Sequence, residues 1–154
     1  FDTSRLPSDA TTDSIKSVVN ELLEAISTND STKAAQLVLK EGHVMRVSNR
    51  LGDNRISFRS NRTFIEQTGN RTIEVYERMW NPVITYRGDI AVAWTTYDLH
   101  INGEFSHCGA ETFNLVRNDN MWLISDWAYT VEPNNCEESP LGPYPYKNKG
   151  LDNE

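Results

Sequence analysis

The stretch from Ile90 to Ile101 constrains the fold most, because it runs directly into a dipeptide that reverses the direction of a chain. The stretch is rich in β-branched and aromatic residues, which favour strands. Asn102-Gly103 follows it, and this pair suits the two positive φ angles of a type I′ hairpin turn. Such a turn fixes the pairing of its strands, and counting outward from it places Asp98 opposite His107. The sequence therefore predicts a tight antiparallel hairpin.

Side chains alternate between the two faces of a strand, so the same count sorts the hairpin residues into two faces. One face is apolar far from the turn and ionisable near it, and we expect this face to line a ligand cavity. It carries Ile90, Val92, Trp94, Asp98, His100, Phe105, His107, Glu111, Phe113 and Leu115. The count assumes a regular ladder. A β-bulge at Gly109 would leave Asp98 and His107 paired but would move Glu111 to the other face.

The remaining elements predict the fold class. Apolar residues at steps of three and four predict a helix from about Asp13 to Ile26, and a shorter helix follows from Ser31. Further expected elements are strands at 43–48 and 55–60, a short helix at 61–68, strand-rich sequence at 71–87 with a bulge or bend at Asn81-Pro82, and a last strand at 121–131. Helices followed by long antiparallel strands predict an α+β fold.

Length and composition indicate one domain with loose ends. At 154 residues the chain is long enough to bury a core of its own. We expect a loose lead-in at residues 1–12, the α+β domain at 13–132 and a proline-rich tail at 133–154.

Charge and cysteine content restrict the partners and the location of the protein. The formal net charge of −7 argues against nucleic acid and anionic membranes as partners, because both would be repelled. No apolar run approaches the roughly 20 residues of a membrane span. The chain begins with Phe1, which indicates a processed product. Cys108 and Cys136 can form a disulfide if the tail folds back along the sheet, so we expect a secreted or periplasmic protein.

Three motifs carry a resemblance to a known family: Phe113-x-Leu-x-Arg117, Trp122-x-Ile124 and Phe105-Ser-His-Cys-Gly109. With the order of elements, they resemble the nuclear-transport-factor-2-like superfamily, which includes SnoaL-like polyketide cyclases and ketosteroid-isomerase-like enzymes. The third motif is similar to one in bacterial secreted members of unknown function. The resemblance implies a strongly curved sheet wrapped around the N-terminal helices, forming a cone with a cavity at its open end. It also implies a homodimer formed through the outer face of the sheet.

Asp98 and His107 form the sharpest catalytic hypothesis. A carboxylate that faces an imidazole fixes its tautomer and raises its basicity, which would make His107 a general acid or base near neutral pH. The alternative is a structural ion pair at the rim of the sheet. Glu111 is expected opposite Trp94, where apolar surroundings would raise the pKa of its carboxyl and let it shuttle a proton. Otherwise it is a rim glutamate or a partner for Arg78.

The neighbour of Glu111 on the last strand depends on the turn before that strand. A loop of four residues would set Asp126 beside Glu111, and a loop of three would set Trp127 there. Two imidazoles and two carboxylates, from His100, His107, Asp98 and Glu111, are also a recognised metal-ligand set. They lack the tight spacing of a dedicated site, and we expect neither a metal nor a cofactor.

Aromatic residues supply the candidate walls of the cavity. These are Tyr76, Trp80, Trp94 and Phe105, with His100 and Asp126 as further ligand contacts. The alternative for each aromatic residue is ordinary core or dimer interface.

These patterns predict a protein that binds a small, partly apolar molecule. Cofactor-free acid–base chemistry of an isomerase, dehydratase or cyclase type would use His107 oriented by Asp98, with Glu111 beside them. The rival hypothesis is a non-catalytic ligand-binding or dimeric interaction module. A third is that side chains fill the cavity and that the outer face, with Thr95, Tyr97 and Leu99, makes the important contacts.

Overall fold

The computed structural model describes residues 9–143, and in that range it contains three helices and six strands. The helices are α1 (Ala10–Ser27), α2 (Ser31–Leu37) and α3 (Asn61–Asn70). The strands are β1 (His43–Ser48), β2 (Arg55–Ser60), β3 (Val75–Arg87), β4 (Ile90–Ile101), β5 (Glu104–Asn118) and β6 (Met121–Val131). The expected order of elements is confirmed.

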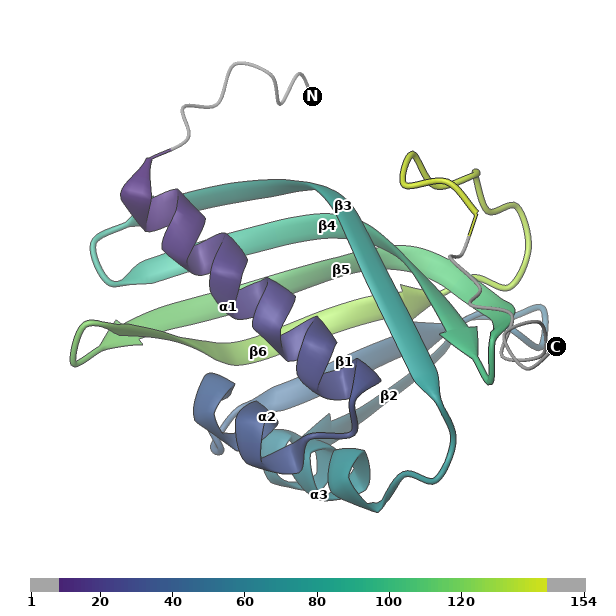
Figure 1. The fold of residues 1–154 in the computed structure, drawn as a ribbon, viewed down its shortest axis with the longest axis horizontal. Helices are drawn as coiled ribbons and strands as arrows, with labels where there is room; N and C mark the ends of the chain where they lie inside the picture. Colours follow the sequence, from purple (N-terminus) through teal and green to yellow (C-terminus); the bar gives the residue numbers. More distant parts are fainter. Residues whose placement is uncertain (1–8, 144–154) are drawn as a thin grey trace, which may run out of the picture.

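The strands form one sheet in the order β2-β1-β6-β5-β4-β3. All neighbours are antiparallel except β1 and β6, which run parallel. Helix α1 lies across one face of this sheet, and α2 and α3 gather beside β1 and β2 (Figure 1). The α+β class, with a mostly antiparallel sheet wrapped around N-terminal helices, is therefore confirmed.

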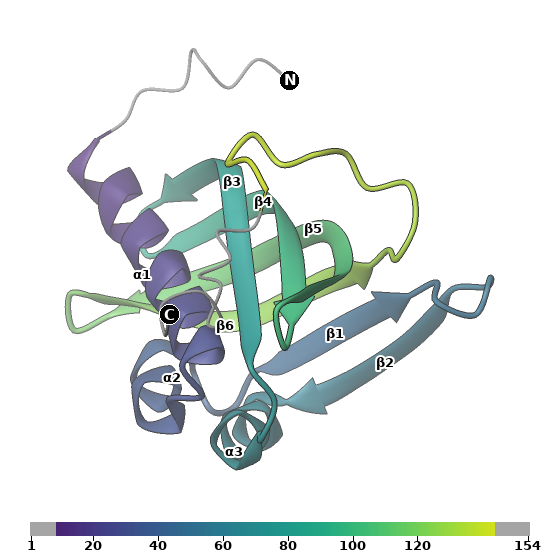
Figure 2. The same ribbon diagram turned by 45° about the vertical axis from the view of Figure 1, so that its right-hand side comes forward.

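Helix α1 begins at Ala10, earlier than the expected Asp13, because Asp9 caps it. The Asp9 side chain accepts a hydrogen bond from the backbone N–H of Thr12 at 2.7 Å, which satisfies one free donor of the first turn. The buried face of α1 consists of Ile15, Val19, Leu22, Leu23, Ala25 and Ile26. This face joins the main core, and Figure 2 shows the sheet curving around the helix. Residues 1–8 of the expected lead-in lie outside the described residues.

The central hairpin has the predicted turn but a different register. Asn102 and Gly103 have φ angles of 48° and 83°, as a type I′ turn requires. Beyond the turn, Ser106 is an unpaired bulge residue, so His107 lies opposite Leu99 and Asp98 lies opposite Cys108. The expected pairing of Asp98 with His107 is wrong, and so is the expected bulge position at Gly109.

Because of the bulge, the residues of β4 and β5 that share one face of the sheet differ from those of a regular ladder. On β5 beyond the bulge the inward residues are those expected, including His107, Glu111 and Phe113, all of which are buried, whereas Phe105, before the bulge, is exposed. On β4 the buried inward residues are Ala91, Ala93, Thr95 and Tyr97, and Trp94 points outward. Helix α1 packs over this face, and small side chains such as Ala91 and Ala93 allow the close approach. The prediction that Thr95 and Tyr97 face outward is wrong for the same reason.

The last strand also differs from both expected registers. The turn before it has two residues, Asp119 and Asn120, both with positive φ. A second bulge at Ser125 then shifts the ladder, and Glu111 pairs with Tyr129 rather than with Asp126 or Trp127. The expected irregularity at Asn81-Pro82 in β3 is confirmed.

The tail after β6 folds back over the outer side of the hairpin. Cys108 and Cys136 form a disulfide, and the backbone of Cys108 exchanges two hydrogen bonds with Glu132. Figure 2 shows the tail passing from the end of β6 over β5 and β4 toward β3. Residues 144–154 of the expected tail lie outside the described residues. Of the helices within residues 9–143, none has the length and apolar character needed to span a membrane.

Candidate functional site

A cavity of about 190 Å³ lies between the C-terminal end of α1, the first residues of α3 and the inner face of the sheet. Much of its wall is apolar, with Ile26, Phe64, Val75, Leu99, Trp127 and Val131 among the lining residues. Its polar lining within residues 9–143 consists of two glutamates, two tyrosines, one histidine and three arginines. An apolar pocket with a few convergent polar groups is the usual form of a small-molecule site.

Two glutamates meet inside this cavity. Glu77 comes from β3 and Glu111 from β5, and both residues are buried. Their carboxyl groups lie close enough to share a hydrogen bond when one of them holds a proton. Glu111 Oε2 is fully buried, and no N–H or O–H group within residues 9–143 donates to it. Its hydrogen bonding therefore depends on the proton shared with Glu77 or on a ligand in the cavity.

The surroundings of Glu77 and Glu111 act differently on the pKa values of their carboxyl groups. Burial and the negative charge of Glu77 raise the pKa of Glu111 well above its ordinary value. Burial also raises the pKa of Glu77, while the hydrogen bond with Glu111 and the charge of Arg71 oppose this rise. Two carboxyl groups in contact resist joint ionisation, so the doubly ionised form of the pair is disfavoured. Since the charge of Arg71 opposes the rise at Glu77, the electrostatics favour the proton on Glu111.

His107 lines the same cavity in its neutral form. Its Nδ1 lies 3.1 Å from Arg50 Nη2 and 2.9 Å from Ser106 Oγ. A guanidinium group can only donate, so Nδ1 accepts, and we assign the ring proton to Nε2. Burial, with the charges of Arg50 and Arg46, lowers the pKa of His107 to about 4. At neutral pH this residue is a hydrogen-bond donor through Nε2 rather than the expected general base.

Tyr97 forms a fixed wall beside these groups. Its ring meets His107 edge to face with the ring centroids 5.7 Å apart, and its hydroxyl donates a hydrogen bond to the carbonyl of Thr130. Burial raises the pKa of Tyr97, so the hydroxyl stays neutral. Gly109 leaves room for the ring, because a Cβ there would lie 2.9 Å from Tyr97 Cε1 and 2.3 Å from the Thr130 oxygen.

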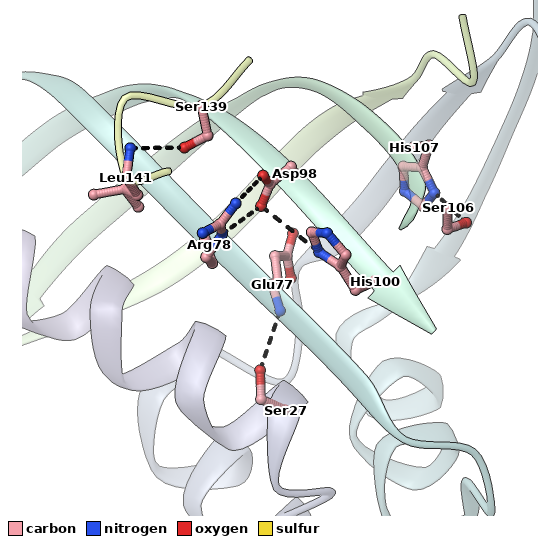
Figure 3. A network of polar contacts seen from close by, with 9 residues as sticks. All are labelled: Ser27, Glu77, Arg78, Asp98, His100, Ser106, His107, Ser139 and Leu141. Carbon is pink, nitrogen blue, oxygen red and sulfur yellow. Dashed lines mark hydrogen bonds and ion pairs between the residues drawn. The ribbon is translucent and has the colours of Figure 1, made fainter. Parts of the chain in front are cut away.

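Asp98 and His100 belong to a separate cluster on the outer face of the sheet (Figure 3). Asp98 accepts hydrogen bonds from Arg78 Nε at 2.9 Å and from Arg78 Nη2 at 2.6 Å, and His100 Nδ1 lies 4.0 Å from Asp98 Oδ1. All three residues are buried, and the tail with Ser139 lies over the Arg78–Asp98 pair in Figure 3. The expected Asp98–His107 catalytic pair is therefore wrong, because its members lie on opposite faces of the sheet.

The other expected ligand contacts also face away from the cavity. They are Tyr76, Trp80, Trp94, His100, Phe105 and Asp126. Trp94, for example, is 44% exposed on the outer surface. The four groups considered as metal ligands are divided in the same way between two faces. Within residues 9–143, no group of three or more His, Cys, Asp or Glu side chains is placed to hold a metal ion.

The sequence-based reasoning missed Glu77 and the arginines of the cavity. A signal for Glu77 exists, because it alternates with the apolar Val75 and Met79 along β3 and so shares their inward face. The arginines carry no such signal, since they come from β1, β2 and the segment after α3 and meet only in the folded protein.

Comparison with known proteins supports the fold. The sequence matches no protein-family model and no curated protein. A nuclear-transport-factor-2-like protein from Cytophaga hutchinsonii is 17% identical with a TM-score of 0.64, over 80% of this chain and 99% of that one. A protein of unknown function with a cystatin-like fold from Nostoc punctiforme is 10% identical with a TM-score of 0.65, over 84% of this chain and 97% of that one. A putative calcium/calmodulin dependent protein kinase II association domain from Xanthomonas campestris is 19% identical with a TM-score of 0.64, over 84% and 93%. At these identities the likeness concerns the fold alone.

Proposed function

We propose that this chain, which has the fold of the nuclear-transport-factor-2-like proteins, binds a small, partly apolar molecule and performs cofactor-free acid–base chemistry on it. One observation supports this most directly: the buried carboxyl groups of Glu77 and Glu111 meet inside the cavity, where burial raises the pKa of both. Two carboxyl groups whose surroundings separate their pKa values are a recognised acid and base. Stability does not require such a pair, because burying carboxyl groups costs free energy.

The pair is suited to moving a proton next to a carbonyl group. Glu77, as the carboxylate, removes a proton from the adjacent carbon, while Glu111 gives its proton to the carbonyl oxygen. The electron pair of the C–H bond forms the C=C bond of an enol, and Glu111 is left ionised. In an unsaturated substrate, Glu77 returns its proton to a more distant carbon as the enol proton returns to Glu111, which gives an isomer. The Nε2–H group of His107 can donate to the oxygen where charge develops.

Deuterium exchange tests this proposal without knowledge of the natural substrate. The protein is incubated in D2O with a panel of small ketones and aldehydes, and NMR follows the loss of C–H signals beside each carbonyl. We expect at least one compound to exchange faster than in buffer, and Glu111→Gln to slow that exchange by about 10²–10⁴-fold. Glu104→Gln, on an exposed residue at the hairpin turn, is the matched control and should keep the wild-type rate. Buffer-level exchange of every compound, or equal rates for wild type and Glu111→Gln, would refute the chemistry.

The outer face of the sheet supports a second function, self-association. One row of residues crosses all six strands as successive ladder partners: Phe58, Met45, Ala128, Thr112, Trp94 and Val83. Phe58 is 71% exposed, and Met45 and Trp94 are also exposed. Exposed apolar surface of this kind is typical of protein–protein interfaces. We therefore propose a homodimer formed through this row, either with the chemistry or as the role of a non-catalytic module.

Size-exclusion chromatography with light scattering tests the dimer. Wild type should elute with the mass of two chains, and Trp94→Glu should elute as a monomer, because the new charge would be buried in the interface. Phe105→Glu changes an exposed aromatic residue outside the row and should stay dimeric. A monomeric wild type would exclude this interface.

The location and the partners expected from the sequence remain part of the proposal. The Cys108–Cys136 disulfide is consistent with an oxidising, extracellular location. The formal net charge of −7 supports the expectation that neither nucleic acid nor anionic membrane is a partner.

A further inference from the structure

Three arginines of the cavity form no direct salt bridge with an acidic side chain in residues 9–143. Arg46, Arg59 and Arg71 all line the cavity and are half-buried. None of the three lies within 4.0 Å of a carboxylate oxygen in residues 9–143. Arg78 and Arg117, in contrast, each contact an aspartate, at 2.6 Å and 2.9 Å. Partly buried charges are usually paired, so three guanidinium groups in one cavity without a direct salt bridge require an explanation.

The three arginines line the cavity together with Tyr129. Burial raises the pKa of Tyr129, and the positive charges of Arg59 and Arg46 oppose this rise. Tyr129 in turn favours the charged form of Arg71. Burial, followed by the like charge of Arg59, lowers the pKa of Arg71. Like charges at short range repel each other, and an anion placed between them would relieve the repulsion.

Much of the hydrogen-bonding capacity of these arginines is unused. Arg71 donates through Nη1 alone, to Ile26 O at 3.0 Å and to Asn29 Oδ1 at 3.3 Å. Arg59 likewise donates only through Nη1, to Gln67 Oε1 at 2.5 Å. Arg46 donates no side-chain hydrogen bond to any residue in the range 9–143. Since each guanidinium carries five N–H donors in a planar fork, the cluster is anchored on one side and can still bind an anion bidentately.

We propose that the ligand is a small organic carboxylate whose anionic end binds Arg46, Arg59 and Arg71 and whose apolar body packs on the walls of the cavity. This inference rests on the proposed function and adds the charge and the class of the ligand. A cavity of about 190 Å³ is smaller than the pockets of roughly 300–1,000 Å³ that hold drug-sized ligands, so the ligand is small. A carboxylate fits better than a phosphate group, because the remaining negative charge of the Glu77–Glu111 pair repels a dianion more strongly than a monoanion.

Binding of matched carboxylates and amides tests the proposal. Titrations of wild type with benzoate, benzamide, isobutyrate, isobutyramide and phenyl phosphate follow the tryptophan fluorescence, to which Trp127 in the cavity wall contributes. We expect at least one carboxylate to bind at least tenfold more tightly than its amide and more tightly than phenyl phosphate. Arg46→Met should weaken carboxylate binding at least tenfold, and it leaves no protein hydrogen bond broken within the described part of the chain. Arg62→Met, on an exposed arginine of α3, removes the same charge outside the cavity and should change the affinity less than twofold.

The outcomes separate this proposal from the proposed function. If the amides bind as tightly as the carboxylates, or if Arg46→Met leaves carboxylate affinity unchanged, the cavity is a binding site but the ligand is not an anion. Tighter binding of phenyl phosphate would replace the carboxylate by a phosphate ester. If no probe binds to wild type at millimolar concentration, both the anion proposal and small-molecule binding in the cavity are refuted. Circular dichroism of each variant at the assay temperature shows that a lost affinity is not lost folding.

Discussion

His107→Gln is expected to change how the stability of the protein depends on pH. The surroundings of this imidazole determine whether it stabilises the protein at high or at low pH. In the folded protein the pKa of His107 is about 4, while an imidazole in the unfolded chain has a pKa near 6.5. Between these values the unfolded state binds more protons than the folded state. The contribution of His107 to stability is therefore present above pH 6.5 and is lost as the pH falls toward 4.

The magnitude follows from the same two values. At 1.36 kcal/mol per pH unit, the interval from about 6.5 to about 4 corresponds to about 3 kcal/mol, of which about 2 kcal/mol falls between pH 7 and pH 5. The imidazole keeps some contact with solvent, which screens the effect, so about 1–2 kcal/mol is expected over that interval. Glu111 acts in the opposite direction: its raised pKa makes the folded state gain stability as the pH falls toward the ordinary carboxyl value of 4.5. Both the wild type and the variant contain Glu111, so this opposing contribution cancels in their difference.

Urea denaturation at pH 7, 6 and 5 and constant ionic strength measures this difference, with tryptophan fluorescence as the signal. The free energy of unfolding of wild type, relative to that of His107→Gln, should fall by about 1–2 kcal/mol from pH 7 to pH 5. His43→Gln removes an imidazole that is exposed on β1 and serves as the control. Identical pH profiles for wild type and His107→Gln would show that the imidazole is not buried against Arg50, and the assignment of His107 as a neutral donor would then be wrong.

Further predictions concern the acid pair, the outer ion pair, the disulfide and one close backbone contact. As the pH rises from 5 to 8, wild type should lose stability relative to Glu111→Gln, because the raised pKa of Glu111 lets the folded state hold its proton; thermal melts of both proteins across that range measure this. Asp98→Ala should cost about 3–5 kcal/mol in urea denaturation, since it leaves Arg78 buried without its carboxylate, yet it should not change ligand binding in the cavity. Replacing Cys108 and Cys136 by serine should cost roughly 3 kcal/mol in the same assay, because the disulfide closes a loop with a sequence separation of 28. Gly42→Ala should cost roughly 3 kcal/mol or more, since its Cβ would lie 1.6 Å from the backbone oxygen of Ser125; a melting temperature within 2 °C of wild type would contradict this contact.

The elements that could be predicted from the sequence are those whose signals are local. The turn at Asn102-Gly103 needs positive φ angles that few other residue pairs adopt, and the structure has them there. The irregularity at Asn81-Pro82 follows from a proline that cannot donate to the ladder. The helix of residues 10–27 shows its apolar stripe in the sequence, and only its first turn was missed, because Asp9 provides the cap.

The faces of the hairpin could not be predicted, because they depend on tertiary contacts. The large apolar side chains of β4, such as Trp94, were expected on the inner face of the sheet. Where α1 packs against β4, however, the inward positions hold the small alanines at 91 and 93. A row of large residues on the outside is also what an interface with another protein needs. Periodicity alone identifies two faces and does not tell which of them meets the helix.

The bulge at Ser106 decides whether the proposed site exists at all. With β4 held against α1 by its small side chains, a regular ladder would place Cys108, Ala110 and Thr112 on the inner face of β5. Glu111 would then point outward, and Glu77 would remain in the cavity without a second carboxyl group beside it. The extra residue reverses this, because it turns every side chain of β5 beyond it to the opposite face, and only then do two carboxyl groups meet. Since a serine in a strand is no signal for a bulge, the acid pair follows from the register of the folded sheet and could not be derived from the spacing of residues in the sequence.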